Sequence, residues 1–223
     1  IYETNFKNQI YIFLFIFILP LISVVINEDP RNIFRAITEK RFIDSIKITF
    51  LSASISTLFL IIFFTPFSYT VSRSEFKLKN FIISLSDISI IIPESIAGIA
   101  ILLVYGSRQP IGELVNSFMN LKFDGTFWGI CLSQIFVSIP FYFRTTLRAF
   151  ESVPRELEFT AETLGATRLQ AIIKIALPNA SNGLLHASVL AFGRSAALFG
   201  AVLLIAPNPE TAPILVFNRF QSL

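Results

Sequence analysis

The chain has little charge for its length. Of its 223 residues, 15% are charged and 53% are hydrophobic. Soluble domains carry about 25% charged residues, so this deficit argues against a water-soluble protein. The single cysteine, Cys131, excludes a disulfide framework, and the single histidine, His186, has no companion ligands for a metal centre. A net charge of +3 is too small to indicate a nucleic-acid partner.

Sequence motifs for nucleotide binding and for catalysis are also missing. No Gly-x-x-x-x-Gly-Lys phosphate loop occurs, so ATP chemistry would have to belong to a partner. An intramembrane enzyme finds no support, because there is no paired-His motif, no reactive Cys setting and no matched pair of Asp residues. We therefore expect no catalytic residue, no metal site and no cofactor in this chain.

Long apolar stretches are what the sequence does contain. Five of them reach about the 20 residues needed to cross a bilayer core, and in lipid each must be helical to satisfy its backbone. They cover residues 8–27, 48–72, 80–107, 125–143 and 179–206. The first lacks a small-residue cleavage site before Asn27, which indicates a retained span. The predicted fold class is an all-α membrane protein, a polytopic transmembrane helix bundle forming one domain over residues 1–223.

Aromatic residues and charges add to this prediction. Tyr69, Tyr105, Trp128 and Tyr142 lie near span ends, where half-wet rings are typical of the membrane interface. A cytoplasmic amino terminus places nine basic residues inside and eight outside, with Arg194 within a span. The positive-inside rule thus favours a multi-pass protein of the cell membrane with a cytoplasmic amino terminus and a cytoplasmic 144–178 loop. Since polar, Pro-containing residues follow the fifth span, we expect a sixth span after residue 223.

The segment 153–178 predicts a compact helix–Gly–helix elbow. Pro154 suits a first helical turn, and the helix should run to Leu164. Gly165 can adopt the left-handed conformation that turns the chain. A second short helix should start at Arg168, and Pro178 should mark a bend into the fifth span. The alternative to this elbow is an ordinary amphipathic surface helix between two spans.

This elbow resembles the EAA coupling loop of permeases in bacterial and archaeal ABC importers. The family pattern is Glu-Ala-Ala, three residues, Gly, nine residues, Ile, one residue, Leu-Pro. The residues at matching spacings are Ala161, Gly165, Ile175, Leu177 and Pro178. Phe159 occupies the position of the leading Glu, with Glu158 and Glu162 nearby. The resemblance implies contact with an ATPase subunit through Glu158, Ala161, Glu162, Leu164, Gly165, Ala166, Ile175, Leu177 and Pro178.

Further resemblances point to one branch of that family. Residues 87–105 are similar to the third span of molybdate, tungstate and sulfate permeases, and Gly193-Arg194 with Phe199-Gly200-Ala201 resembles their fifth span. Leu198 replaces the usual acidic residue there. The tail 212–220 is similar to molybdate/tungstate permeases. These resemblances imply the helix bundle of type I (MetI-like) ABC importers and an oxyanion substrate, molybdate or tungstate first and sulfate as the alternative.

Polar or flexible residues within the spans are candidates for the translocation path or gate. They are Asp87, Pro93, Glu94, Gly98, Arg194, Phe199 and Gly200. An unpaired Arg194 would cost about 3 kcal/mol in lipid. It could face the path and attract a divalent oxyanion, or it could form a structural pair with Asp87 or Glu94. Pro93 and Gly98 could open a bend beside the pore, or serve only packing.

The resemblance also implies an assembly. Two permease copies would form the pore as a homodimer in the lipid bilayer. Two cytoplasmic ATP-binding subunits, holding ATP and Mg²⁺, would dock on the elbows, and an extracytoplasmic binding protein would deliver the oxyanion. An ATP-independent transporter or channel is the competing hypothesis. It would rely on Asp87 and Glu94 for ion coupling and leaves the Gly165-to-Pro178 spacing unexplained.

Overall fold

A computed structural model describes residues 11, 13–20, 22–23 and 30–222. The chain divides into two compact units, residues 1–44 and residues 45–223, and the expectation of a single transmembrane domain stays a prediction. In the first unit the described residues of the predicted span 8–27 are helical, and the rest of that span lies outside the described residues. Helix α2 (Pro30–Thr38) follows, and α3 (Lys40–Arg73) begins in this unit and continues into the second.

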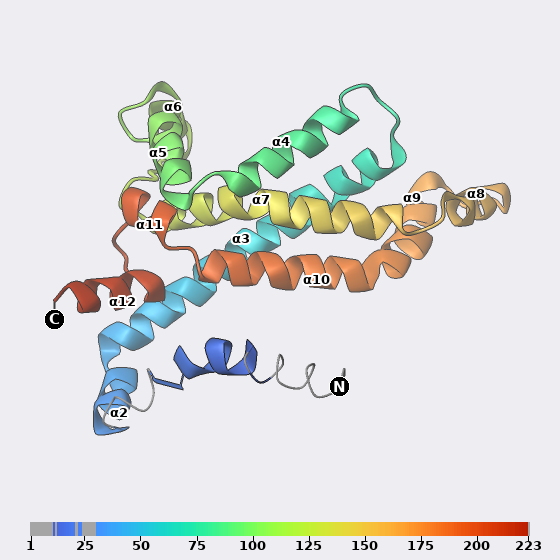
Figure 1. Ribbon diagram of the computed structural model, residues 1–223. Coiled ribbons are helices and arrows are strands. Elements are labelled where there is room, and N and C mark those ends of the chain that lie inside the picture. The colour runs from blue at the N-terminus through green and yellow to red at the C-terminus, as the bar shows by residue number, and fades with distance from the viewer. Residues whose placement is uncertain (1–10, 12, 21, 24–29, 223) are drawn as a thin grey trace. The chain divides into compact units, whose positions relative to one another are not determined.

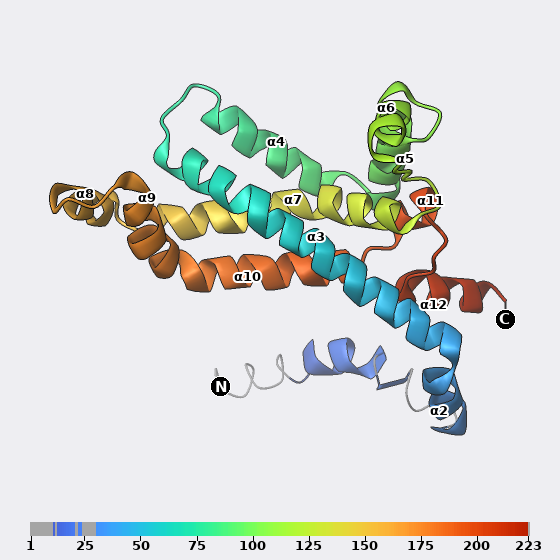
Figure 2. The same ribbon diagram turned by 180° about the vertical axis from the view of Figure 1, so that it is seen from behind.

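The second unit is built from helices and no strand occurs among its described residues. After α3, they are α4 (Lys79–Ile91), α5 (Glu94–Tyr105), α6 (Pro110–Met119), α7 (Phe127–Glu151), α8 (Arg155–Thr163), α9 (Arg168–Ala171), the π-helix η1 (Ile172–Ala176), α10 (Leu177–Ala196), α11 (Gly200–Ile205) and α12 (Ala212–Gln221). Helices α7 and α10 lie side by side along most of their length (Figures 1 and 2). Helices α8 and α9 lie at one end of this pair, and α5 and α11 at the other.

Small polar side chains hold the three long helices together. Ser52 and Ser56 of α3 are fully buried, and both bond the side chain of Gln134 in α7 at 3.0 Å. The Gln134 amide also donates to the Ser195 carbonyl of α10, at 3.0 Å. Small residues let membrane helices approach closely, and buried amides need partners where no water is present. This network fixes the register of α3, α7 and α10.

The expectation of one continuous helix per apolar stretch is wrong at two places. Stretch 80–107 is broken after Ile91, because Pro93 cannot continue the helical bonds and extends the preceding residue. Stretch 179–206 is broken between Ala196 and Gly200, and α11 starts there as a separate helix. Discontinuous helices of this kind expose backbone polar groups that need partners within the protein.

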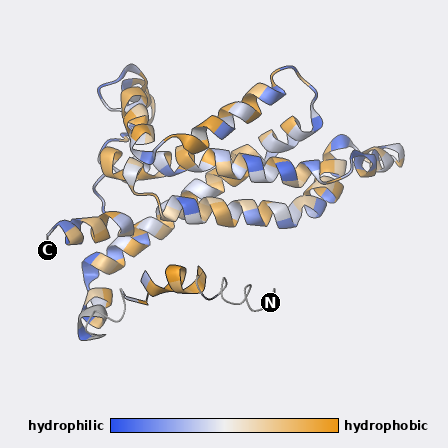
Figure 3. Cartoon of the chain, viewed as in Figure 1, coloured by the Kyte–Doolittle hydropathy of each residue, from blue (hydrophilic) through white to orange (hydrophobic). Residues whose placement is uncertain are grey.

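Within the described residues, two helices are long and apolar enough to cross a membrane, α3 and α7, and α5 is a shorter apolar helix. Helix α10 has 20 residues, but Asn179, Asn182 and Arg194 make it more polar. Figure 3 shows hydrophobic residues prevailing on α4 and α5, whereas α7 and α10 carry both kinds. The count of five spans stays a prediction.

Two of the aromatic residues assigned to the membrane interface are buried instead. Tyr142 is 1% exposed, and its hydroxyl shares a 2.8 Å hydrogen bond with Thr65. Tyr69 is also buried, and its hydroxyl donates to Glu158. A buried phenol needs a hydrogen-bond partner, and in both cases another helix supplies one. These rings therefore act in helix packing.

Candidate functional site

The elbow begins with α8 and turns at a glycine. Gly165 has a φ of +96°, and its backbone N–H donates to Glu162 while that of Ala166 donates to Ala161, each at 3.0 Å. This pair of bonds is the Schellman motif, which satisfies the last carbonyls of a helix. An added Cβ at Gly165 would meet nothing within 4 Å, so the glycine is required by its conformation and not by crowding.

The second half of the elbow runs directly into α10. Thr167 and Gln170 form a capping box that starts α9, with Thr167 N–H donating to the Gln170 side chain at 2.9 Å. The π-helix η1 then joins α9 to α10, and Pro178 lies in the first turn of α10. Asn179 donates from its side chain to the Ile175 carbonyl at 2.7 Å, which satisfies a carbonyl beside the proline. A widened helical turn, η1, thus directly precedes Pro178, the residue at which a bend was expected.

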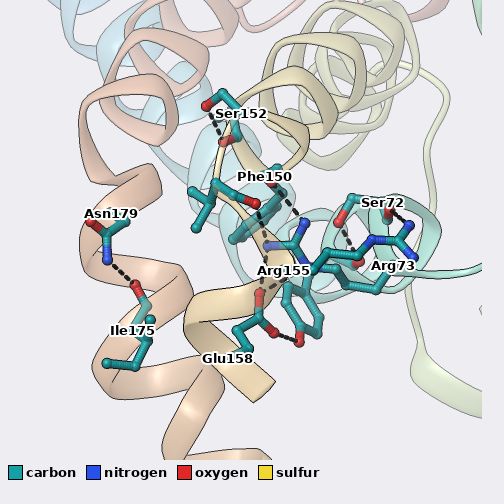
Figure 4. Close-up of polar contacts among 11 residues, drawn as sticks. Ser72, Arg73, Phe150, Ser152, Arg155, Glu158, Ile175 and Asn179 are labelled. Atoms are coloured by element: carbon teal, nitrogen blue, oxygen red, sulfur yellow. Dashed lines mark hydrogen bonds and ion pairs between the residues drawn. The ribbon is translucent and has the colours of Figure 1, made fainter. Parts of the chain in front are cut away.

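A buried arginine ties the elbow to the end of α3. Arg73 donates from Nε to Glu158 Oε1 at 2.8 Å and from Nη2 at 2.5 Å. Its remaining donors reach the carbonyls of Phe150 at 3.0 Å and Val153 at 3.1 Å. The Tyr69 hydroxyl donates to the other carboxylate oxygen of Glu158. Figure 4 shows this arrangement, which we name the Arg73 clamp (Tyr69, Arg73, Phe150, Val153 and Glu158).

The Arg73 clamp makes one mechanical unit of three segments. The side chains of Arg73 and Glu158 are only 8% and 10% exposed. Two guanidinium nitrogens donate to Glu158 Oε1 and the Tyr69 hydroxyl donates to the other carboxylate oxygen, so these contacts fix the orientation of the carboxylate as well as its distance. The Arg73 clamp therefore joins α8 to the end of α3 and to the end of α7. Glu158, placed by the sequence among the residues that contact a partner, faces its own chain.

Other elbow residues do offer an outward surface. Three large apolar side chains on or beside α8 and α9 are largely exposed: Phe159 at 64%, Leu164 at 84% and Leu169 at 65%. Glu162 and Ala166 flank them, the first exposed and the second half-buried. In contrast, Ile175 and Leu177 are half-buried, and Leu177 packs on the cluster around Phe150. The predicted coupling residues therefore differ in exposure: Glu162, Leu164, Gly165 and Pro178 are exposed, Ala161, Ala166, Ile175 and Leu177 are half-buried, and Glu158 is buried.

A second polar centre lies at the opposite end of α10. Glu94, the first residue of α5, accepts from Arg194 of α10 at 2.8 Å. Its other carboxylate oxygen accepts from the backbone N–H groups of Phe199 at 3.4 Å and Gly200 at 3.2 Å. One carboxylate thus accepts the backbone N–H groups at the break before α11 and also neutralises the Arg194 side chain. Of the alternatives for Arg194, the structure shows the pair with Glu94.

The two broken segments also touch backbone to backbone. A Cβ added to Gly98 would lie 2.9 Å from Ala201 Cα and 3.0 Å from its carbonyl oxygen. Gly98 is therefore required for the close approach of α5 and α11. Pro93 stands at the N-cap of α5 and sets its start. Six of the seven predicted path residues, all except Asp87, gather at this junction.

A bulkier residue at Gly98 is expected to separate α5 from α11. We expect Gly98→Val to lower the unfolding temperature of the purified transporter by several degrees, since overpacking costs about 1–3 kcal/mol. Gly193→Val is the matched control, because no atom lies within 4 Å of an added Cβ there. Equal unfolding temperatures for the two variants would contradict the assigned close approach.

Asp87 lies apart from this junction. Its carboxylate pairs with Arg144 Nε of α7 at 2.9 Å. The sequence singled out Asp87 but gave no site role to Arg144 or Arg73. The only available signal was a charge at the end of an apolar stretch, which the positive-inside rule already explains.

Residues 65–221 match the family described as binding-protein-dependent transport system inner membrane component. The chain is 36% identical over 214 residues to the molybdate/tungstate transport system permease protein WtpB of Methanocaldococcus jannaschii, which covers 96% of this chain and 82% of that protein. It is 32% identical to the sulfate transport system permease protein CysT of Escherichia coli, over 92% of this chain and 76% of that one.

A solved structure shows the same fold. It is the crystal structure of a bacterial alginate ABC transporter in complex with an alginate pentasaccharide-bound periplasmic protein. The match has a TM-score of 0.70 at 18% sequence identity and covers 96% of this chain and 78% of the matched chain. The expected helix bundle of an ABC importer permease is thereby confirmed.

Proposed function

Since the chain belongs to the family of inner membrane components of binding-protein-dependent transport systems, we propose that it is the permease subunit of an ATP-driven importer for molybdate or tungstate. The family consists of membrane transport components, so the chain is a transport subunit and not an enzyme. Relatives named for molybdate/tungstate transport align over most of the chain, which supports the substrate. Sulfate is the alternative, supported by the relative named for sulfate transport.

The observation that carries the coupling role is the elbow itself. Its apolar residues Phe159, Leu164 and Leu169 are largely exposed, and this exposed apolar surface favours a partner that covers it. Behind that surface, the Arg73 clamp joins α8 to α3 and α7. A displacement of the elbow would therefore be transmitted to the long helices through side-chain contacts, and not only through the connecting loops. This is the arrangement needed to convert closure of an ATPase subunit into rocking of spans.

The proposed assembly has two permease copies, two ATP-binding subunits and an extracytoplasmic binding protein. The elbow and the amino terminus would lie in the cytoplasm. A binding-protein partner is supported by the family description and by the matched complex, which contains a periplasmic protein. Two copies are supported by the charged residues that α4, α7 and α10 leave partly exposed, because such side chains avoid lipid.

Docking of the ATPase is tested at Gly165. Gly165→Val is expected to lower the amount of ATPase that co-purifies by about tenfold, because a β-branched residue at a φ of +96° is strained by roughly 1–3 kcal/mol. Gly165→Asn is the matched control, since asparagine tolerates positive φ best among residues with a side chain. Normal ATPase recovery with Gly165→Val would rule out this elbow as the docking point.

The substrate is tested by reconstitution. The complete transporter in proteoliposomes should hydrolyse ATP faster when its loaded binding protein carries molybdate or tungstate than when it carries sulfate. The measurement is ATP hydrolysis against oxyanion concentration with each anion in turn. Stimulation by sulfate alone would reassign the substrate to the alternative, and stimulation by none of the three would overturn the proposal of an oxyanion importer.

A further inference from the structure

A charged groove lies between α4, α7 and α10. It has a volume of about 270 Å³ and is lined by Asp87, Phe141, Arg144, Thr145, Arg148 and Leu190, among others. The residues from α7 recur every three or four positions, so they share one face of that helix. The groove is separate from the elbow and from the junction at Glu94.

Three arginines form a column, of which Arg144 and Arg148 line the groove and Arg194 lies beside it, against the ring of Phe141. Arg144 and Arg148 are one helical turn apart, or about 6 Å along the axis of α7. Above them, the guanidinium carbon of Arg194 lies 5.3 Å from the centre of the Phe141 ring, which itself lines the groove. Leu190, one turn before Arg194 on α10, lines it too. The column therefore leads from the broken end of α10 toward the elbow end of α7.

The carboxylates facing this column do not cancel its charge. Asp87 pairs with Arg144 at 2.9 Å, and Glu94 pairs with Arg194 at 2.8 Å. Arg148 is exposed, and in the described part of the chain no carboxylate forms an ion pair with it. Since the Asp87 and Arg144 side chains are 48% and 25% exposed within the helical bundle, the groove must face water or protein instead of lipid.

We propose that this groove is an inner binding station for a tetrahedral oxyanion dianion, an inference that rests on the proposed function. Guanidinium groups bind oxyanions through paired N–H donors. A volume of about 270 Å³ admits such an ion with several waters at about 30 Å³ each. Asp87 competes for Arg144, so the ion is held weakly enough to leave, as conduction requires. The Thr145 hydroxyl donates to the Phe141 carbonyl at 2.8 Å and takes no part.

Uptake by the reconstituted transporter measures the contribution of Arg148. Arg148→Gln is expected to lower molybdate uptake by about tenfold, because a charged cleft concentrates counter-ions by factors of about 10 to 1,000. Co-purification of the ATPase should be unchanged. Arg108→Gln, at an exposed position far along the chain from the groove, is the matched control and should leave uptake unchanged. Uptake by Arg148→Gln equal to that of Arg108→Gln would overturn the proposal.

A second measurement detects the anion preference of the groove itself. Thr145→Cys in a Cys131→Ser background is labelled in nanodiscs with a negatively charged or a positively charged methanethiosulfonate. The anionic-to-cationic rate ratio, divided by that of an exposed Ser117→Cys, should exceed about tenfold, and molybdate should slow the anionic reaction. Adding Arg148→Gln should bring the normalised ratio toward one.

The two measurements separate the two proposals. Suppose that the wild-type transporter takes up molybdate, but the labelling ratio is near one and insensitive to Arg148→Gln. This result would contradict the proposed binding station in the groove and would leave the proposed importer function intact. If the wild-type transporter takes up no oxyanion, the proposed function fails, and the station fails with it.

Discussion

Replacing Arg73 by methionine is expected to unfold the elbow junction and to stop ATP-driven uptake. The substitution leaves the buried Glu158 carboxylate without its cation and removes the donors to the carbonyls of Phe150 and Val153. Breaking a buried pair in this way costs about 3–5 kcal/mol. We expect the unfolding temperature of the purified transporter to fall by roughly 10 °C or more and uptake to fall at least tenfold.

A second substitution distinguishes lost charge balance from lost contacts. Arg73→Met combined with Glu158→Gln removes the stranded charge, while the glutamine oxygen can still accept from the Tyr69 hydroxyl. The double variant should therefore be more stable than Arg73→Met alone, yet remain uncoupled, because the guanidinium contacts that join α3 to Glu158 and to the end of α7 are gone and only single hydrogen bonds from Tyr69 and to Ser72 still join α3 to α8. ATP hydrolysis without uptake is the signature to measure. Normal uptake by the double variant would show that the Arg73 clamp does not transmit motion.

The control for the Arg73 clamp is an ion pair that also joins neighbouring segments, but whose side chains are more exposed to solvent than those of Arg73 and Glu158. Lys79 at the start of α4 pairs with Glu151 at the end of α7 at 3.2 Å, with side chains 21% and 42% exposed. Pairs of this kind contribute about 1 kcal/mol or less. Lys79→Met should therefore lower the unfolding temperature only slightly and leave uptake near the wild-type rate.

The elbow was predictable because its determinants are local. The turn at Gly165 depends on hydrogen bonds within five residues, and the restart of the helix depends on Thr167 and Gln170. Short-range capping chemistry can be read from a sequence one motif at a time. The all-helical class followed in the same way from uninterrupted apolar stretches.

The Arg73 clamp was not predictable by such reasoning. Arg73 and Glu158 are 85 residues apart, and no local pattern distinguishes an arginine that pairs inside the protein from one that simply ends a span. The break before Gly200 was missed for a related reason. No proline marks it, and it exists because Glu94, more than 100 residues earlier, accepts the freed N–H groups of Phe199 and Gly200.

Glu94 should therefore be the most sensitive residue at the opposite end of the bundle. Glu94→Ala leaves Arg194 without its carboxylate partner and leaves the two N–H groups of Phe199 and Gly200 without their acceptor. Unsatisfied buried groups cost about 1–3 kcal/mol each, and a charge costs more. We expect little folded protein in the membrane fraction, measured by size-exclusion chromatography in detergent.

Glu94→Gln separates the two tasks of this side chain. The amide oxygen can still accept from the N–H groups of Phe199 and Gly200, whereas the charge that neutralises Arg194 is gone. Folding should then be largely restored relative to Glu94→Ala. If Arg194 acts on the anion, uptake at low molybdate should rise or hold with Glu94→Gln and fall with Arg194→Gln, because the first releases the guanidinium and the second removes it. If the pair is only structural, Glu94→Gln and Arg194→Gln should lower the folded yield by similar amounts. Uptake per folded molecule should then be equal for the two variants. In that case the column of arginines that acts on the anion would begin at Arg144.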